Sequence, residues 1–373
     1  MILIMIKTIN GWRAVFALMI VLFHVGATSF EEMTWAGVSF FLMASGFLLT
    51  LKHPFKQLDG AAYRRFAWNH AAKIFPLHWL TLVMWLVAMA ILGLLAIKPL
   101  TLVLNATLLH SWSLIHSIYF SCNKFSWFLS TLLFCYLCYP LLAKWFTPLR
   151  LRYKVIIILI AAIIDFALLA GSDDYWRTAL YVFPPVRLID FVIGMTMAHC
   201  CQSPKMVRLL GKGENGTDAE LITIALLSVT VLSFQAYSFL LPWSDAIIWW
   251  LPIAAILVVC KLYDKREGFI GKLLASKPLQ WLGDISFELF MLQGIAALVY
   301  NYWIAPVVAH IGLQSIYNTV AADLLGASAP GLIVWFIIPI DVLLAWLVNR
   351  LFTRPLKRIT RQSFQSSQSR DSR

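Results

Sequence analysis

Charged residues are the scarcest class in this chain. Of its 373 residues, 13% are charged and 61% are hydrophobic, and the mean hydropathy is +0.78. Soluble globular domains carry about 25% charged residues, because they need them to cover their surface. The composition therefore excludes a water-soluble domain and predicts an integral membrane protein whose partner is the lipid bilayer.

Acidic residues are fewer still, with 18 Asp and Glu against 30 Lys and Arg, which gives a net charge of +12. A basic protein can bind nucleic acid when its cations form a patch on a soluble face. Here the Lys and Arg residues lie between apolar runs, so we expect no nucleic-acid partner. The excess of Lys and Arg is better explained by the loops between membrane spans, where basic residues set the orientation of the protein.

Cysteine is also sparse, with six residues in the chain. Cys135 and Cys138 form its only CxxC pattern, but they lie inside an apolar run, where this spacing is typical of small-residue packing. We therefore expect no metal site. The first apolar run, about 9–29, is as long as a full span and lacks a small-residue cleavage pattern, so we expect it to remain as a signal anchor.

Ten apolar runs are long enough to be candidate transmembrane helices, although the stretch 99–120 could add a re-entrant or interfacial helix. The sequence therefore predicts an all-α fold, a polytopic bundle of about ten spans. The ten runs are approximately 9–29, 34–51, 74–97, 127–147, 154–171, 182–200, 220–240, 246–262, 283–303 and 331–352.

The positions of Lys and Arg predict the orientation of these spans, because cytoplasmic loops collect basic residues. With both termini in the cytoplasm, 25 of the 30 Lys and Arg residues fall on the cytoplasmic side. We expect a multi-pass protein of the cell inner membrane with a transmembrane domain over 1–355. Residues 356–373 are basic and then rich in Ser and Gln, which predicts a disordered cytoplasmic tail.

Charged groups inside spans are costly and usually face a bundle interior or a water-filled cavity, so they are the first candidates for function. They are Arg13, His24, Asp165, Arg187, Asp190, Glu288 and Asp341. The sequence suggests no partner for Asp165, Glu288 or Asp341.

Arg13 and His24 are eleven residues apart, which places them on one helix face and separates them by about 16 Å along the axis. This spacing is consistent with a polar stripe along a route across the membrane. It is equally consistent with an Arg that snorkels to the headgroups and a His that bonds a backbone carbonyl in a packed bundle.

Two further groups of polar residues have both structural and functional interpretations. Arg187 and Asp190, at i and i+3, most simply form a structural ion pair. Arg64, Arg65, His70 and Lys73 precede or begin the third span, where they could anchor the helix by the positive-inside rule or bind the phosphates of a polyanionic ligand.

Six short motifs in order resemble the acyltransferase family 3 membrane proteins. The first is Gly11-Trp12-Arg13, ten residues and then His24, which is similar to the family's Arg and His pattern. The others are Phe40-Phe41-Leu42-Met43-Ala44-Ser45-Gly46-Phe47, Lys73-Ile74-Phe75-Pro76-Leu77-His78-Trp79, Trp127-Phe128-Leu129-Ser130 with Tyr136 and Tyr139-Pro140, Arg187-Leu188-Ile189-Asp190-Phe191 with Gly194, and Leu282-Gly283-Asp284-Ile285-Ser286-Phe287. The chain departs from the family pattern where members commonly carry arginine (His70, Lys73), glutamate (Leu132) or histidine (Gln293).

The resemblance implies transfer of an acyl group, often acetyl, from cytoplasmic acyl-CoA to a hydroxyl of a glycan or glycolipid across the membrane. Acyl-CoA would be a co-substrate, and no permanently bound cofactor is expected. His24 would act as general base, and Arg13 would bind donor phosphate or orient the thioester. Phosphates would meet Arg64, Arg65, His70 and Lys73.

The remaining candidate substrate-binding residues are Ser45, Trp127, Ser130, Arg187, Asp190 and Gln293. Of these, Ser45, Ser130 or Gln293 could stabilise the developing oxyanion. The exported segment 303–330 is expected to contact the acceptor. Two other classes remain open: a transporter or flippase that uses the same polar stripe, and a structural or assembly subunit.

Overall fold

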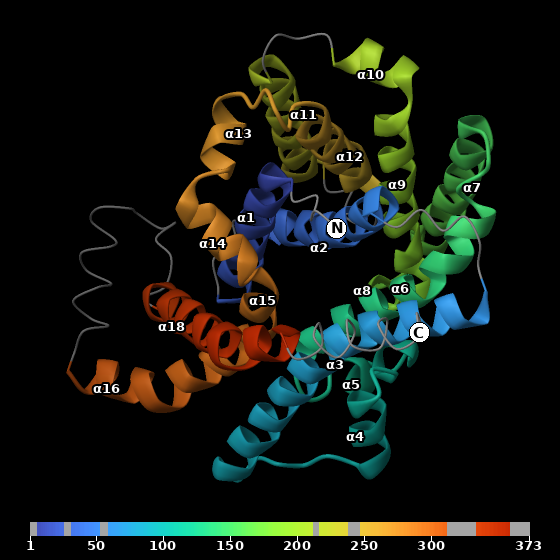
Figure 1. Cartoon of the computed structure of the whole chain (residues 1–373). Helices are drawn as coiled ribbons and strands as arrows, with labels where there is room; N and C mark the ends of the chain where they lie inside the picture. The colour runs from blue at the N-terminus through green and yellow to red at the C-terminus, as the bar shows by residue number, and fades with distance from the viewer. Residues whose placement is uncertain are drawn as a thin grey trace, which may run out of the picture.

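The computed structural model describes residues 6–25, 31–52, 59–211, 216–237, 247–311 and 333–358, and every regular element in these ranges is helical (Figure 1). The all-α prediction is confirmed for this part of the chain. The basic tail beyond Arg358 and most of the predicted acceptor segment, residues 312–332, lie outside the described residues.

Each of the ten predicted runs overlaps a long helix. In the described residues, six helices are long and apolar enough to cross a membrane, or seven if α8 and α9, bent by 56°, form one span. Ten crossings with cytoplasmic termini therefore stay a prediction. The ten helices are α1 (Lys7–His24), α2 (Glu31–Lys52), α3 (Gly60–Ile91), α6 (Trp127–Trp145), α7 (Leu151–Leu169), α9 (Pro184–Gln202), α11 (Thr217–Ala236), α12 (Ile247–Leu262), α15 (Ser286–Val299) and α18 (Ile333–Val348).

The helix of the third predicted span begins before the apolar run. Its helix starts at Gly60, where the Asp59 side chain accepts a hydrogen bond from the Ala62 amide, and it runs for 32 residues. Such a helix is about 48 Å long, which exceeds the roughly 30 Å hydrocarbon core. Residues 60–73 contain several good helix formers but are too polar to register as a span, so the helix begins before the apolar run predicted at 74–97.

The stretch 99–120 does not form one re-entrant helix. It is divided among α4 (Pro99–Ala106), η2 (His110–Trp112) and α5 (His116–Tyr119), and η3 (Lys124–Ser126) leads into α6. Leu108 and Cys122 have φ values of 59° and 56°, a left-handed conformation that interrupts a right-handed helix. These turns carry the chain back toward α6 and bring Lys124 and Phe125 next to α1.

The shorter remaining elements connect or extend the long helices. They are α8 (Asp174–Val182), α10 (Pro204–Leu210), α13 (Phe269–Leu274), α14 (Lys277–Asp284), the π-helical turns η5 (Tyr300–Ile304) and η7 (Asn349–Thr353), and α16 (Ala305–His310). Glu220 of α11 accepts hydrogen bonds from the backbone amides of Gly268, Ile270 and Gly271 at 2.8–3.0 Å. This carboxylate fixes the start of α13 against α11.

α1 and α2 lie at the centre of the molecule, with α9 and α12 on one side and α15 and α18 on the other (Figure 1). α2 and α9 cross closely because glycine faces backbone at the contact. A Cβ on Gly194 would lie 1.9 Å from the Met43 carbonyl oxygen, and one on Gly46 would lie 2.1 Å from that of Phe191. Small residues of this kind let membrane helices approach.

Gly194→Ala is expected to destabilise the fold, because the added methyl overlaps the backbone of α2. Overpacking of this kind typically costs about 1–3 kcal/mol. Thermal unfolding of the detergent-solubilised protein measures the effect. Gly60→Ala is the matched control, since a Cβ at Gly60 meets nothing within 4 Å. Equal unfolding temperatures for both variants would contradict the close crossing.

Candidate functional site

His24 ends α1 and lines a cavity of about 830 Å³, here called the His24 cavity, between α1, α2, α8, α15 and the segment 116–127. Its Nδ1 lies 2.7 Å from the Ile20 carbonyl oxygen. Because a carbonyl can only accept, Nδ1 must donate this hydrogen bond. Neutral His24 therefore carries its lone pair on Nε2, the arrangement that a general base requires.

Gln293 of α15 lies beside His24. Its Nε2 donates to the Phe290 carbonyl at 2.9 Å, whereas its buried Oε1 makes no hydrogen bond with the residues that the structure describes. The family pattern often has histidine at this position, and the amide here places a free acceptor next to the imidazole.

The walls of the His24 cavity combine aromatic rings with a few polar groups. Trp127, one of the predicted substrate-binding residues, lies in the wall. The other aromatic members are Phe23, Trp35, Phe120, Phe125, Tyr181 and Phe290, and the polar members are Thr34, His116, Lys124, Asp174, Arg177 and Thr178.

Arg13 lines a second cavity of about 320 Å³, here called the Arg13 cavity. No Asp or Glu belongs to its lining among the described residues. Its polar members are Arg13, Ser45, Lys52, His70, Lys73, Tyr136, Thr353 and Lys357. The predicted residues Ser45, His70 and Lys73 are thus brought together with Arg13, and the cavity is strongly basic.

Lys52 and Lys357 were missed by the sequence reasoning. Lys52 lies seven residues after Ser45, two helical turns along α2, so the same helix face could have indicated it. Lys357 lies in the segment assigned to the tail, and hydropathy carries no signal that this segment returns to the bundle. The helix after η7 continues to Arg358.

The Arg13 guanidinium is held by a polar cluster at the start of α1. Asn10 Oδ1 lies 3.5 Å from Arg13 Nη1, and Asn10 Nδ2 donates to the Gln280 carbonyl and to Asp284 Oδ1, each at 3.1 Å. Tyr136, Glu288 and Asp284 are its electrostatic partners. This cluster orients a cation that lines the cavity.

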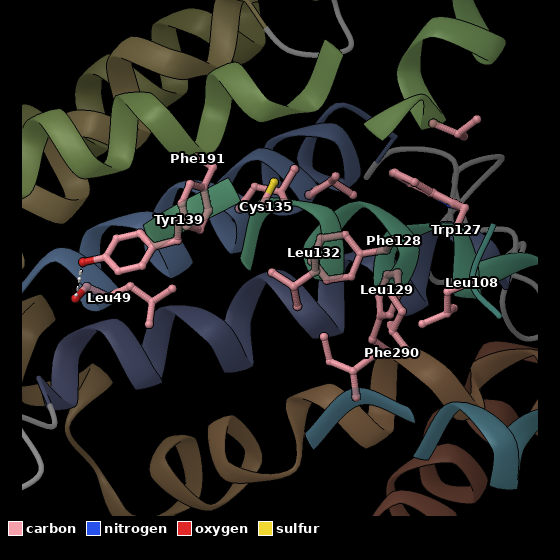
Figure 2. Packing of buried hydrophobic residues seen from close by; sticks show 14 of the residues in the cluster. Leu49, Leu108, Trp127, Phe128, Leu129, Leu132, Cys135, Tyr139, Phe191 and Phe290 are labelled. Atoms are coloured by element: carbon pink, nitrogen blue, oxygen red, sulfur yellow. Dashed lines mark hydrogen bonds between the residues drawn. The ribbon is translucent and has the colours of Figure 1, made fainter. Parts of the chain in front are cut away.

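A row of phenylalanines lies where the two cavities approach each other. The ring centroids are 6.1 Å apart for Phe41 and Phe128, 5.2 Å for Phe128 and Phe290, and 6.1 Å for Phe290 and Phe125. Phe41 and Phe128 line the Arg13 cavity, and Phe125 and Phe290 line the His24 cavity. Phe128 and Phe290, whose rings meet between the cavities, are labelled in Figure 2. The polar stripe expected on α1 is therefore divided by an aromatic partition.

Arg187 and Asp190 form a buried ion pair, with 3.3 Å between Nε and Oδ2, and line neither cavity. Arg187 Nη2 donates to Ser39 Oγ at 3.0 Å, and Trp250 Nε1 donates to Asp190 Oδ1 at 2.8 Å. These bonds join α2, α9 and α12, which favours the structural interpretation of the pair.

Three other predicted residues also lie outside the cavity walls. Arg64 and Arg65 are exposed on the extension of α3. Ser130 is buried and donates to the Leu108 carbonyl at 2.5 Å. The structure thus places none of the three beside Arg13 or His24.

Of the remaining acids in predicted spans, one has a hydrogen-bond partner and two have none among the described residues. Glu288 accepts a hydrogen bond from Asn349 Nδ2 at 2.8 Å, which joins α15 to η7. The carboxylates of Asp165 and Asp341 are buried and make no hydrogen bonds with the described part of the chain. No group of His, Cys, Asp or Glu among the described residues is arranged to hold a metal ion.

Comparison with known families decides the class of the protein. A family model described as an acyltransferase domain, that of acyltransferase family 3, matches residues 6–350. The chain belongs to acyltransferase family 3. Neither the curated proteins nor the solved structures gave a match. The described part of this family 3 acyltransferase consists of helices, several of them apolar enough to cross a membrane, as in a multi-pass membrane protein, and acyl transfer is its class of chemistry.

Proposed function

We propose that this acyltransferase moves an acyl group, most simply acetyl, from cytoplasmic acyl-CoA to a hydroxyl of a glycan or glycolipid on the far side of the inner membrane. One observation carries the proposal. A basic cavity around Arg13 and a cavity lined by His24, whose Nδ1 donates to Ile20 and leaves Nε2 able to accept a proton, meet at a row of phenylalanines.

The Arg13 cavity has the charge that the donor requires. Acyl-CoA carries several phosphate groups, and Arg and Lys are the side chains that bind phosphate best. Lys52, Lys73 and Lys357 supply ammonium groups, and Arg13 supplies a guanidinium held by Asn10. In the predicted topology, this cavity lies at the cytoplasmic end of α1, where the donor is available.

Because Arg13 and His24 are far apart on α1, the phosphates and the thioester of the donor would bind in different cavities. α1 rises by about 16 Å between Arg13 and His24. The phosphates remain with the basic residues, so the flexible pantetheine arm has to carry the thioester toward His24. Because Phe128 and Phe290 meet across the partition, a change of side-chain rotamer at one of them would open this path.

His24 then activates the acceptor. Nε2 removes the proton from the acceptor hydroxyl, whose oxygen attacks the thioester carbonyl and forms a C–O bond. Collapse of the tetrahedral intermediate breaks the C–S bond, and the imidazolium returns its proton to the departing CoA thiolate. Ser45 and Ser130 each donate their one hydroxyl proton to a backbone carbonyl, so either would have to change partner to stabilise the oxyanion. Gln293 Nε2 donates one of its two N–H groups to the Phe290 carbonyl and keeps a second N–H for an oxyanion.

A transporter or flippase is the second candidate, because two cavities, one at Arg13 and one at His24 of the same helix, also suit alternating access. Such a protein would move its solute without cleaving acyl-CoA. Membership of an acyltransferase family favours acyl transfer over this alternative.

The experiment uses membranes that contain the protein, labelled acetyl-CoA and the envelope glycan fraction of the host. We expect one free CoA thiol for each acetyl group incorporated, and neither product in membranes without the protein. Movement of glycan across the membrane without thiol release would instead establish the transporter.

A further inference from the structure

Lys124 is a cation of the His24 cavity that has no counter-ion among the described side chains. It begins η3, just before α6, and its side chain is exposed. Its ammonium makes no hydrogen bond or ion pair within the described part of the chain. Its one contact of note is with the Phe125 ring, whose centroid lies 5.1 Å from Nζ.

The same phenylalanine places Lys124 near the proposed base. The His24 imidazole packs on Phe125 with 4.8 Å between ring centroids. Since both groups contact one ring, the Lys124 ammonium lies within about 10 Å of the His24 imidazole. One ligand can therefore touch both.

The other charges among the described residues that line the cavity leave this cation uncompensated. Arg177 pairs with Asp174 on the same helix, so the two cancel. A cavity with one excess positive charge favours an anionic ligand. Trp127 and Tyr181 add aromatic surface against which the apolar face of a sugar ring can pack.

We propose that the acceptor is acidic, a glycan or glycolipid whose carboxylate or phosphate binds Lys124 while a nearby hydroxyl meets His24. This inference rests on the proposed function, because it names the acceptor of the same cavity. Since Lys124 is one of few basic residues on the predicted exported side, positive-inside topology does not account for it.

Binding is tested without acyl transfer. The full-length protein in nanodiscs of zwitterionic lipid is titrated with glucuronate, glucose 1-phosphate and glucose, and tryptophan fluorescence is recorded, because Trp35 and Trp127 line the cavity. Lys124→Met and Lys124→Arg are compared with Lys98→Met, an exposed lysine outside the cavity. The two anionic probes distinguish a carboxylate from a phosphate ligand.

We expect at least one anionic probe to bind wild type and Lys98→Met roughly tenfold or more tightly than glucose does, since hydrogen bonds to charged groups are the stronger class. Lys124→Met should lose this preference, Lys124→Arg should keep it, and added salt should weaken it. Equal binding of all three sugars to wild type, or an anionic preference that survives Lys124→Met, would overturn the proposal.

The transfer assay distinguishes this proposal from the function on which it rests. Lys124→Met should raise KM for an acidic acceptor and leave kcat unchanged. A lower kcat with every acceptor would place Lys124 at the oxyanion and overturn the acidic acceptor. Anion binding that depends on Lys124, without acyl transfer by wild type, would contradict the proposed function and leave the ligand class intact.

Discussion

Replacement of His24 by alanine is expected to lower acyl transfer by about 10²–10⁴-fold, the usual contribution of a general base. The reason is geometric. Ile20 holds Nδ1–H, and the remaining nitrogen, Nε2, is the basic atom of a ring that lines the His24 cavity. The rate of labelled acetyl transfer at matched protein level measures this loss.

His199→Ala is the control for this variant. His199 also lies in a long helix, α9, but lines neither cavity. It should retain most of the activity if loss of an intramembrane imidazole is not itself harmful. A His24→Ala protein that folds normally and transfers acetyl at close to the wild-type rate would refute the general-base role.

Arg13→Met is expected to raise KM for acetyl-CoA by roughly 10–100-fold, because it removes charge-assisted hydrogen bonds to the donor's phosphates, worth about 1.5–3 kcal/mol each. Arg13→Lys should recover part of the loss, since an ammonium keeps the charge but not the planar fork that Asn10 orients. Initial rates at varied acetyl-CoA concentration measure both effects.

The double variant Arg64→Met with Arg65→Met is the matched control, because these arginines are exposed on α3 outside the Arg13 cavity. It should leave KM within about twofold of the wild-type value, as expected for exposed charges. A loss of kcat without a change in KM for Arg13→Met would show that Arg13 acts on the thioester. Normal values of both would exclude Arg13 from donor binding.

The helices could be predicted where the helix and the apolar run coincide. The apolar run 127–147 corresponds closely to α6. The extension of α3 was missed because residues 60–73 are helical without being apolar enough to span lipid. The turns at Leu108 and Cys122 were missed because nothing in either residue type signals a positive φ.

Part of the site was predictable, from the spacing of residues on one helix and from the motifs that contributed Ser45, His70, Lys73 and Trp127 to the cavity walls. The spacing of Arg13 and His24 along α1 identified two residues that line cavities. Lys357 could not be found, because its position depends on how the chain packs after α18. The motif residues Arg187 and Asp190 matched the family but join helices, since sequence does not distinguish a buried ion pair from a ligand contact.

Acyl transfer between two sides of a sealed membrane tests the central claim most directly. The protein is reconstituted in liposomes with labelled acetyl-CoA on the side of the Arg13 cavity and acceptor on the side of the His24 cavity. The account predicts labelled acceptor in the second compartment with wild type and none with His24→Ala. Label that appears only when donor and acceptor share one compartment would contradict it.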